Sequence, residues 1–527
     1  MTEKIYTFDT TLRDGTQGES VSLSVRDKVQ IIERLDDIGI DYIEVGFPAS
    51  NPKDEELFKI LKTRKFDNAK IVSFGRTKYK GVKASDDENV KMLIGSEADT
   101  VCIFGKSSAF QSQKIIETSL DSNLDMIYDT VSYLKKNVKE VIFDGEHFFD
   151  GFKENPDYAI KTLKTAEEAG ADYVVVCDTN GGILPMDVSE IIEIIKKEIK
   201  IPLGVHYHND NGCAVANSVL SVYHGAAMVQ GTINGYGERA GNADLCQIIP
   251  NLEIKMGKRC LPEGNLRHIT NLSRFVAEIA NQVPSSHQPF VGNSAFAHKA
   301  GMHVSGVSKY PSAFEHMSPE LVGNTRRILI SELSGKKSVL IKAKEFGIDL
   351  DKEPEKVSRI LDKVQKLEHG GYQFEAADAS FELMVKEIAG FKKTYFILES
   401  FRILNEKRES GEMLSEATVK IHIDGNRIIE TGEGVGPVNA LDKALRKALL
   451  SFYPDLEKIN LTDFKVRVLD EKKGTGAIVR VLIESSDGEK NWGTIGVSEN
   501  IIEASWQALF DSIIYGLDMI TDRKKSG

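Results

Sequence analysis

Two histidines separated by one residue, His206 and His208, stand in the segment VHYHND near the middle of the chain. If this segment is a strand, residues at positions i and i+2 point to the same face, so both imidazoles enter the same space. The segment DTTLRDGTQ near the N-terminus places Arg13 and Asp14 directly after another β-rich run. Imidazole nitrogens and a carboxylate oxygen together suit a divalent ion such as Mn, Zn, Co or Mg. We therefore expect an open metal site that can polarise a substrate carbonyl.

Eight short β-rich runs in the first half of the chain must position these residues. The runs begin at Ile5, Tyr42, Lys70, Thr100, Glu140, Tyr173, Leu203 and Met228. Stretches with helical periodicity lie between them, for example at 25–38 and 156–169, and the alternation of strand and helix predicts parallel pairing. Eight near-equal units within residues 1–266 favour a closed (β/α)8 TIM barrel over an open doubly wound sheet.

In such a barrel, functional residues gather where strands end and helices begin. The segments that carry the histidine pair and Asp14 fall at such positions. The eighth unit ends in GTINGYGERAGNADL, whose glycines allow the backbone to approach a ligand closely, and which contains Glu238, Arg239 and Asn242. Taken alone, this last segment can also be read as a tight barrel turn.

The segments DTTLRDGTQ, HYHND and GYGERAGNAD together resemble the signatures of the acyl-CoA-condensing metalloenzymes that include isopropylmalate, homocitrate and citramalate synthases. IEVGFPASNPKD, FDGEHFFDGF, CDTNGG and ELVGNTRRILISELSG are similar to the citramalate synthase branch, so the resemblance covers essentially the whole chain. It implies an acyltransferase that condenses acetyl-CoA with pyruvate and hydrolyses the thioester to give citramalate and CoA. The alternatives are a synthase that uses a larger 2-oxo acid, a metal-dependent lyase or aldolase, and a non-catalytic branched-chain amino-acid sensor.

The resemblance also implies roles for individual residues at the metal site. Asp14, His206 and His208 would ligate the divalent ion, and Asn242 would be a fourth ligand. Arg13 carries a permanent charge and would stabilise the oxyanion that develops during the condensation.

Further residues match positions that act on the substrates in the family. Glu146 and Thr179 match positions that contact substrate, and Glu146 is expected to take part in catalysis. His303, in KAGMHVSGV, matches a histidine that acts as the base at a barrel mouth, in characterised relatives the mouth of the partner subunit. The chain departs from the family at Phe314, where a tyrosine is expected. Tyr310 could supply the missing hydroxyl, His303 could work with water, or the hydroxyl could be dispensable.

The second half of the chain is expected to form two further parts. Residues 267–410 are mainly helical in pattern and connect the barrel to residues 411–527, where alternating strands and helices suggest a duplicated strand, strand, helix unit. The stretch GVGPVNALDKAL resembles the regulatory domain of the isopropylmalate synthase family, which dimerises and binds the end-product amino acid. The resemblance implies a homodimer or higher oligomer inhibited by isoleucine. The same stretch can be read as a Gly-rich dinucleotide loop, since it follows a strand and precedes a helix.

Composition narrows the class of protein. The 527 residues include 67 Lys and Arg against 79 Asp and Glu, a formal charge of -12, and the basic residues are scattered, which argues against a nucleic-acid or membrane-surface partner. The N-terminus lacks the apolar stretch of a signal peptide, and no apolar run approaches the roughly 18 residues of a membrane span. Five cysteines without a CxxC pair suggest neither a disulfide framework nor a thiolate zinc site. We expect a cytoplasmic protein.

Overall fold

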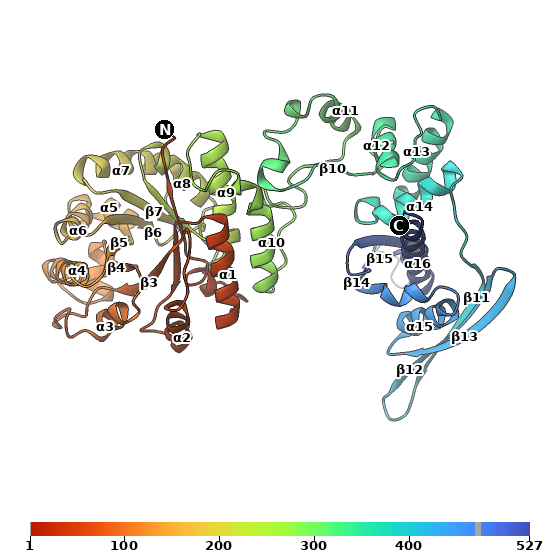
Figure 1. Cartoon of the computed structure of the whole chain (residues 1–527), viewed down its shortest axis with the longest axis horizontal. Helices are drawn as coiled ribbons and strands as arrows, with labels where there is room; N and C mark the ends of the chain where they lie inside the picture. Colours follow the sequence, from red (N-terminus) through yellow and green to blue (C-terminus); the bar gives the residue numbers. More distant parts are fainter. Residues whose placement is uncertain (1, 470–475, 527) are drawn as a thin grey trace. The chain divides into compact units, whose positions relative to one another are not determined.

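The computed structural model describes residues 2–469 and 476–526 of the chain (Figure 1). The chain forms two compact units. The first contains Met1–Phe296 together with Met317–Thr325, and the second contains Ala297–His316 together with Arg326–Gly527.

The first unit is built around a closed barrel of eight strands in sequence order, and every neighbouring pair is parallel. The strands are β1 Tyr6–Asp9, β2 Tyr42–Gly46, β3 Lys70–Arg76, β4 Thr100–Lys106, β5 Glu140–Glu146, β6 Tyr173–Asp178, β7 Leu203–Tyr207 and β8 Met228–Gly231. β1 pairs with β8, where Tyr6 lies opposite Met228, and this pairing closes the barrel. The predicted (β/α)8 barrel is confirmed.

Helices surround the barrel strands (Figure 1). They are α1 Val25–Ile38, α2 Pro52–Leu61, α3 Glu88–Gly95, α4 Leu120–Lys135, α5 Phe148–Glu154, α6 Pro156–Glu168, α7 Pro185–Glu198 and α8 Ala214–Tyr223, followed by α9 Leu245–Pro250 and α10 Ile269–Ile279. Local signals set their ends. Ser24 and Asp27 form a reciprocal capping box at the start of α1, and Gly39, with φ of 94°, ends that helix in the left-handed conformation.

Alternation along the strands separates two apolar clusters and positions the functional residues. One cluster fills the barrel interior and includes Phe8, Ile142 and Met228, whereas the other packs the strands against the helices. Because side chains alternate, the inward position that follows Ile142 on β5 is Asp144, and the one that follows Met228 on β8 is Gln230. The interior therefore changes from apolar to polar towards the carboxyl ends of these strands.

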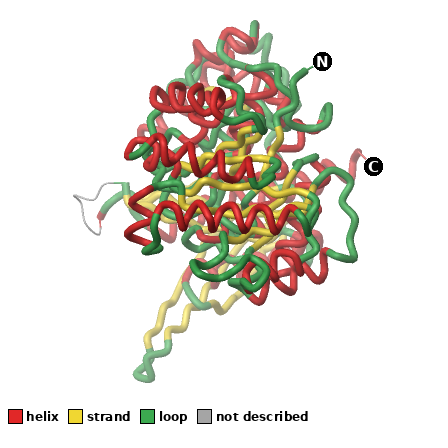
Figure 2. Tube along the Cα trace, turned by 90° about the vertical axis from the view of Figure 1, so that its left-hand side faces the viewer, coloured by secondary structure: helices red, strands yellow, loops and turns green. Residues whose placement is uncertain are grey.

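The second unit contains a helical part and two antiparallel three-stranded sheets, each followed by a helix (strands yellow, helices red in Figure 2). Its helices are α11 Gly301–Lys309, α12 Lys336–Glu345, α13 Pro354–His369, α14 Asp378–Ala389, α15 Pro437–Leu450 and α16 Ile501–Ser526. Its strands are β9 Ala297–His298, β10 Arg327–Ile328, β11 Ile397–Lys407, β12 Met413–Ile423, β13 Asn426–Gly434, β14 Asn460–Val468, β15 Val479–Ser486 and β16 Asn491–Ser498.

Strand β11 corrects one expectation from the sequence. It lies inside 267–410, where a mainly helical pattern was expected, and it pairs with β12 from Ile397 to Lys407 with one irregularity between Leu398 and Ser400. The sheets have the orders β11-β12-β13 and β14-β15-β16, so the repeated unit is three strands and a helix, not two strands and a helix. Most of β11 is partly or fully exposed, and its sequence ILESFRILNEK carries charged residues, which weakened the strand pattern.

The glycines of TGEGVGP serve packing between β13 and α15. A Cβ atom on Gly432 would lie 2.6 Å from the backbone nitrogen of Ala444, and one on Gly434 would lie 2.5 Å from that of Ala440. Only glycine allows the helix to pack this closely against the strand. This packing explains the glycine spacing without a dinucleotide.

Within residues 2–469 and 476–526, no helix combines the length and the apolar character that crossing a bilayer requires.

A candidate metal centre at the barrel mouth

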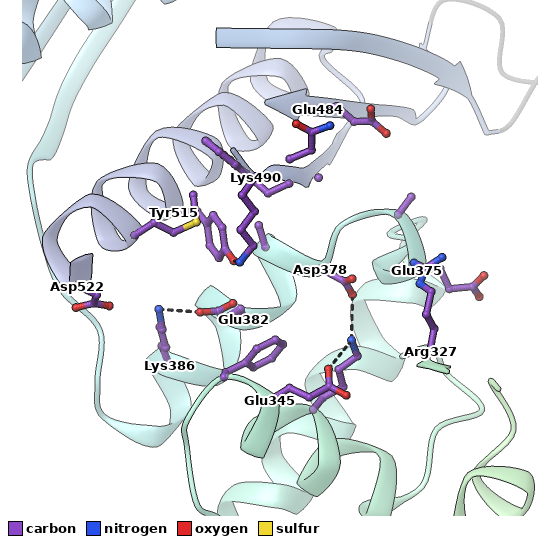
Figure 3. Close-up of a pocket in the computed structure, with 18 of the residues that line it drawn as sticks. Arg327, Glu345, Glu375, Asp378, Glu382, Lys386, Glu484, Lys490, Tyr515 and Asp522 are labelled. Carbon is purple, nitrogen blue, oxygen red and sulfur yellow. Dashed lines mark hydrogen bonds and ion pairs between the residues drawn. The ribbon is translucent and has the colours of Figure 1, made fainter. Parts of the chain in front are cut away.

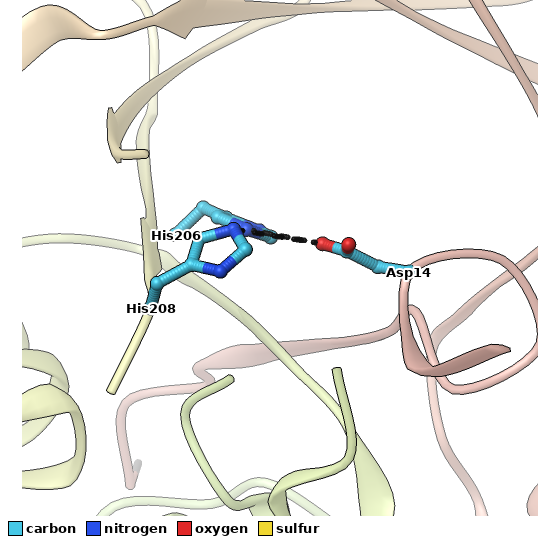
Figure 4. A group of neighbouring side chains, drawn as sticks. All are labelled: Asp14, His206 and His208. Atoms are coloured by element: carbon cyan, nitrogen blue, oxygen red, sulfur yellow. Dashed lines mark ion pairs between the residues drawn. The ribbon is translucent and has the colours of Figure 1, made fainter. Parts of the chain in front are cut away.

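Asp14, His206 and His208 meet inside the mouth of the barrel. The Nε2 atom of His206 lies 3.3 Å from Oδ2 of Asp14, and the Nε2 atom of His208 lies 3.9 Å from the same oxygen (Figure 4). All three side chains are buried, and one ligand atom from each lies within 4.8 Å of the others. His206 is on β7, His208 follows this strand, and Asp14 follows β1. The structure thus brings together three residues that are far apart in the sequence.

The charges in this cluster favour binding of a cation. Burial would raise the pKa of Asp14, but the adjacent Arg13 and a hydrogen bond with His206 hold it below its usual range. Burial and the neighbouring His206 lower the pKa of His208 to about 4. At neutral pH, Asp14 is therefore a carboxylate and His208 a neutral imidazole, the forms in which both residues bind metal ions.

Asn242 offers a fourth donor atom beside His208. The two residues pair in an antiparallel bridge, and Asn242 is 1% exposed. Its Nδ2 donates to the carbonyl oxygen of Tyr236 at 3.1 Å, whereas its buried Oδ1 has no hydrogen-bond partner. An unpartnered buried polar atom costs roughly 1–3 kcal/mol, so Oδ1 suits a role as ligand. Two imidazoles, a carboxylate and an amide oxygen, without thiolate, fit a divalent ion such as Mn, Mg, Zn or Co.

Arg13 is held rigidly beside the metal cluster. Its Nε lies 2.6 Å from Oε2 of Glu44, and its NH1 lies 3.5 Å from Oδ1 of Asp14. Its guanidinium carbon lies 3.8 Å from the centroid of the Phe74 ring. Burial raises the pKa of Glu44, although the charge of Arg13 and the hydrogen bond from its Nε oppose this effect. The two carboxylates and the aromatic face fix the guanidinium where charge can develop on a substrate.

A cavity of about 490 Å³ opens onto this cluster. Its lining includes eight of the residues that the sequence singled out: Arg13, Asp14, Glu146, Thr179, His206, His208, Glu238 and Arg239. Glu146 forms an ion pair with Lys106, and the hydroxyl of Thr179 accepts a hydrogen bond from the backbone of His147 at 2.8 Å. These eight residues therefore face one space.

Three phenylalanines form an apolar wall of the same cavity. The rings of Phe47 and Phe74 meet edge to face, with centroids 5.9 Å apart, and Phe74 stacks on Phe104 at 5.4 Å. Because Phe74 also carries the guanidinium of Arg13, the apolar wall and the cationic group are coupled. The cavity thus combines metal-binding groups, a fixed positive charge and an apolar surface.

Some residues of the site were not anticipated from the sequence. Glu44 lies within β2, and Gln230 within β8, and neither side chain is exposed. Lys106, at the end of β4, pairs with Glu146. A charged or amide side chain in an otherwise apolar strand, such as YIEVG or MVQG, could have indicated a functional residue, because such groups are rarely buried without a partner.

His303 lies on α11 in the second unit and is exposed. Its ring centroid is 5.0 Å from that of Phe314, and a Cβ atom on Gly306 would collide with the Phe314 ring. Tyr310, which could supply a hydroxyl, is 73% exposed. The role of His303 as a base at a barrel mouth stays a prediction.

A larger cavity, of about 1010 Å³, lies in the second unit (Figure 3). Several of its charged groups form ion pairs with one another. Lys386 pairs with Glu382 at 2.8 Å, and Lys342 pairs with Glu345 at 3.0 Å. Among the residues that the structure describes, only Asp14, His206 and His208 form a His, Cys, Asp and Glu group suited to a metal ion. The barrel cavity is therefore the candidate active site.

Family models match three segments of the chain. Residues 4–276 match the HMGL-like family, residues 290–371 match the homocitrate synthase post-HMGL domain-like family, and residues 375–517 match the LeuA allosteric (dimerisation) domain. The first match covers the barrel, and the last covers the two sheets with α15 and most of α16.

Full-length relatives are similar along nearly the whole chain. The (R)-citramalate synthase of Geobacter sulfurreducens is 53% identical over 97% of this chain and 97% of its own length. That of Aquifex aeolicus is 51% identical over 98% of each chain. The 2-isopropylmalate synthase of Methanocaldococcus jannaschii is 33% identical over 97% of this chain and 94% of its own length.

Proposed function

The chain belongs to the (R)-citramalate synthase family, and we propose that it condenses acetyl-CoA with pyruvate and hydrolyses the thioester to give citramalate and CoA. The observation that carries this proposal is the buried cluster of Asp14, His206 and His208 beside the fixed guanidinium of Arg13. A non-catalytic sensor would have no use for these groups. The relatives named citramalate synthase, at 46–53% identity, favour this activity over that of the 2-isopropylmalate synthase at 33%.

In this proposal, Asp14, His206, His208 and Asn242 hold a divalent ion of the Mn, Mg, Zn or Co type, which supplies Lewis acidity at the 2-oxo group of pyruvate. Arg13, restrained by Glu44, places its positive charge where the oxyanion develops. Its position is fixed before the reaction, so little free energy is spent on reorganisation when the charge forms.

The remaining steps require groups that contact the substrates. His303 would take the methyl proton of acetyl-CoA, and the resulting enolate would add to the carbonyl carbon of pyruvate. Glu146 and Thr179 line the cavity and would orient the bound keto acid. Hydrolysis of the thioester then releases CoA and makes the condensation effectively irreversible.

The phenylalanine wall offers an apolar surface to the side chain of the acceptor. Phe47, Phe74 and Phe104 occupy one side of the cavity with mutually packed rings. The methyl group of pyruvate can lie against such a wall. A single methylene is worth only ~1–3 kcal/mol of discrimination, so the preference must be measured.

We further propose that the C-terminal part binds isoleucine, the end product to which citramalate leads, and mediates a homodimer. The match to the LeuA allosteric (dimerisation) domain supports both roles. A cavity of about 600 Å³ between α15 and β14 offers a place for the effector. Leu461 and Phe464 line it with apolar surface, and Asp442, paired with Arg446 at 2.8 Å, adds charge that an ammonium group can meet.

The test is the release of free CoA from acetyl-CoA with pyruvate, 2-oxobutanoate, 2-oxoisovalerate and 2-oxoglutarate offered in turn. We expect pyruvate to have the highest kcat/KM, with citramalate as the product. Chelation should abolish turnover, and added Mn or Mg should restore it. A clear preference for 2-oxoisovalerate would assign the chain to the 2-isopropylmalate synthases, and full activity of a verified metal-free preparation would remove the metal from the reaction.

A further inference from the structure

A chain of three buried side chains leads from the metal cluster to the barrel interior. Nδ1 of His206 lies 2.9 Å from Oε1 of Gln230, and Nε2 of Gln230 donates to Oδ1 of Asp144 at 3.1 Å. Gln230 has no exposed surface, His206 is 5% exposed and Asp144 is 4% exposed. The three residues come from β7, β8 and β5, so the barrel itself holds them together.

The second of these contacts fixes the orientation of the Gln230 amide. A carboxylate oxygen only accepts hydrogen bonds, so the group of Gln230 that faces Asp144 is its NH₂. The amide oxygen is then left facing His206, and it too can only accept. If the amide were turned over, its oxygen would face the carboxylate of Asp144 without a hydrogen between them.

The orientation of the amide in turn selects the tautomer of His206. Because Oε1 of Gln230 accepts, Nδ1 of His206 must carry a hydrogen, so only Nε2 is left to bind a metal ion once it releases the proton that it shares with Asp14. Nε2 is the atom that faces Oδ2 of Asp14, at 3.3 Å. The contact therefore leaves Nε2 as the ring nitrogen that faces the metal cluster.

We propose that Gln230, held by Asp144, is a positioning residue that fixes His206 as an Nε2 ligand of the divalent ion. This inference rests on the metal site of the proposed function. A metal-bound histidine commonly donates its other N–H to an acceptor, and loss of that acceptor typically weakens metal binding 10- to 100-fold. Here the acceptor is a neutral amide, so it orients the imidazole without placing a second negative charge against the ring.

The test compares metal binding by the full-length protein and by variants in which the side chain at position 230 no longer accepts a hydrogen bond from His206. Gln230→Met and Gln230→Leu both remove the amide, and Gln230→Met nearly preserves the side-chain volume. Asn217→Leu is the control, because Asn217 is also a buried amide of the barrel unit, 1% exposed, but donates to the backbone of Ile183 at 3.0 Å. Mn²⁺ affinity is measured by calorimetry, and the ligand environment by the visible absorption of the Co²⁺-loaded protein.

We expect both Gln230 variants to bind Mn²⁺ roughly 10- to 100-fold more weakly and to show a changed Co²⁺ spectrum, while Asn217→Leu keeps both properties. Two folded Gln230 variants with wild-type affinity and spectrum would overturn the inference while leaving the metal site intact. If Gln230→Leu does not fold, the near-isosteric Gln230→Met decides alone. A wild-type protein that binds no divalent ion and yet turns over would instead overturn the proposed metal site, and this inference with it.

Discussion

Nε of Arg13 lies 2.6 Å from Oε2 of Glu44, a carboxylate without any exposed surface. The other oxygen of Glu44, Oε1, is buried without a hydrogen-bond partner. The ion pair with Arg13 is therefore the main interaction that offsets the desolvation of Glu44. Such a pair adds little net stability, because the desolvation of both charges offsets their attraction. Its effect is to hold the guanidinium at one position in the cavity.

Glu44→Gln tests that effect. The amide is isosteric but uncharged, so it holds the guanidinium of Arg13 less firmly, and the stabilisation of the developing oxyanion weakens. We expect kcat for citramalate formation to fall about 10- to 100-fold, somewhat less than for the loss of an oxyanion donor itself. Glu33→Gln, which removes an exposed partner of Arg64, is the control and should leave kcat unchanged. Wild-type turnover in Glu44→Gln would mean that Asp14 and Phe74 suffice to hold Arg13.

Phe104→Ala tests whether the aromatic wall limits the size of the acceptor. Removing this ring opens the wall next to Phe74 while leaving the stack of Arg13 on Phe74 in place. We expect kcat/KM for 2-oxobutanoate to rise relative to that for pyruvate by a factor of about 10 or more, the usual effect of one methylene. The measurement is competition between the two keto acids. An unchanged ratio would place the acceptor's side chain elsewhere in the cavity.

The fold was largely predictable because the barrel repeats one local pattern. Each of the eight barrel strands begins within a residue of its predicted start, and helix α1 has the predicted bounds, since Ser24 and Gly39 mark its ends chemically. Strand β11 was missed because its register depends on pairing with β12 and not on a local apolar alternation. Pairing between distant segments is the part of the fold that local patterns do not encode.

Site residues that follow the strands could be predicted from the sequence, whereas some of those that lie within the strands could not. Asp14 and His208 stand in polar segments that follow strands, where the functional residues of such a barrel gather. Glu44 and Gln230 lie inside apolar strands, and their meaning depends on partners from other strands. Which buried groups face one another is set by barrel closure, so the support of Arg13 and of His206 became visible only in three dimensions.

His303→Ala addresses proton transfer. If His303 is the base that acts on acetyl-CoA, the variant should fold and bind pyruvate normally while its kcat falls by about 10²- to 10⁴-fold. Binding of pyruvate is followed by calorimetry, and exchange of the methyl protons of acetyl-CoA by NMR in deuterated water. Tyr310→Phe is the companion variant, since this exposed tyrosine could supply the hydroxyl absent at Phe314. A rise in the KM for pyruvate alone would assign His303 to binding.

Asp511→Asn should make the stability of the second unit less sensitive to pH. Burial raises the pKa of Asp511 to about 6, although Ser380 donates a hydrogen bond to it at 2.7 Å. Between pH 4 and 6 the folded state therefore holds a proton that the unfolded state has released, and the free energy of unfolding decreases as pH rises. A shift of this size corresponds to on the order of 3 kcal/mol, which the asparagine variant should recover above pH 6.

The measurement is denaturant unfolding at a series of pH values, followed by the fluorescence of Trp492 and Trp506. These are the two tryptophans of the chain, and both belong to the apolar core of the second unit. Glu387→Gln is a control for which the pH dependence of stability has the opposite sign, because hydrogen bonds from Lys392 and Lys363 lower the pKa of Glu387 to about 2. Its stabilising contribution should be lost as pH falls. Parallel pH curves for Asp511→Asn and wild type would refute the raised pKa.

Phe464→Ala tests the proposed effector cavity. The ring of Phe464 lines this cavity together with Leu461, and removing it takes away apolar surface worth about 1–2 kcal/mol against an aliphatic side chain. We expect the inhibition constant for isoleucine to rise roughly tenfold while kcat without isoleucine stays unchanged. Val468→Ala is the matched control, since Val468 lies on the same strand, is 47% exposed and does not line the cavity.

Coupling between two sites is reciprocal, so if isoleucine weakens pyruvate binding, saturating pyruvate must weaken isoleucine binding by the same factor. Calorimetry with and without pyruvate measures that factor. If Phe464→Ala is inhibited as strongly as Val468→Ala, isoleucine acts at another place, whereas a wild-type enzyme indifferent to every branched-chain amino acid would leave the C-terminal part with dimerisation alone.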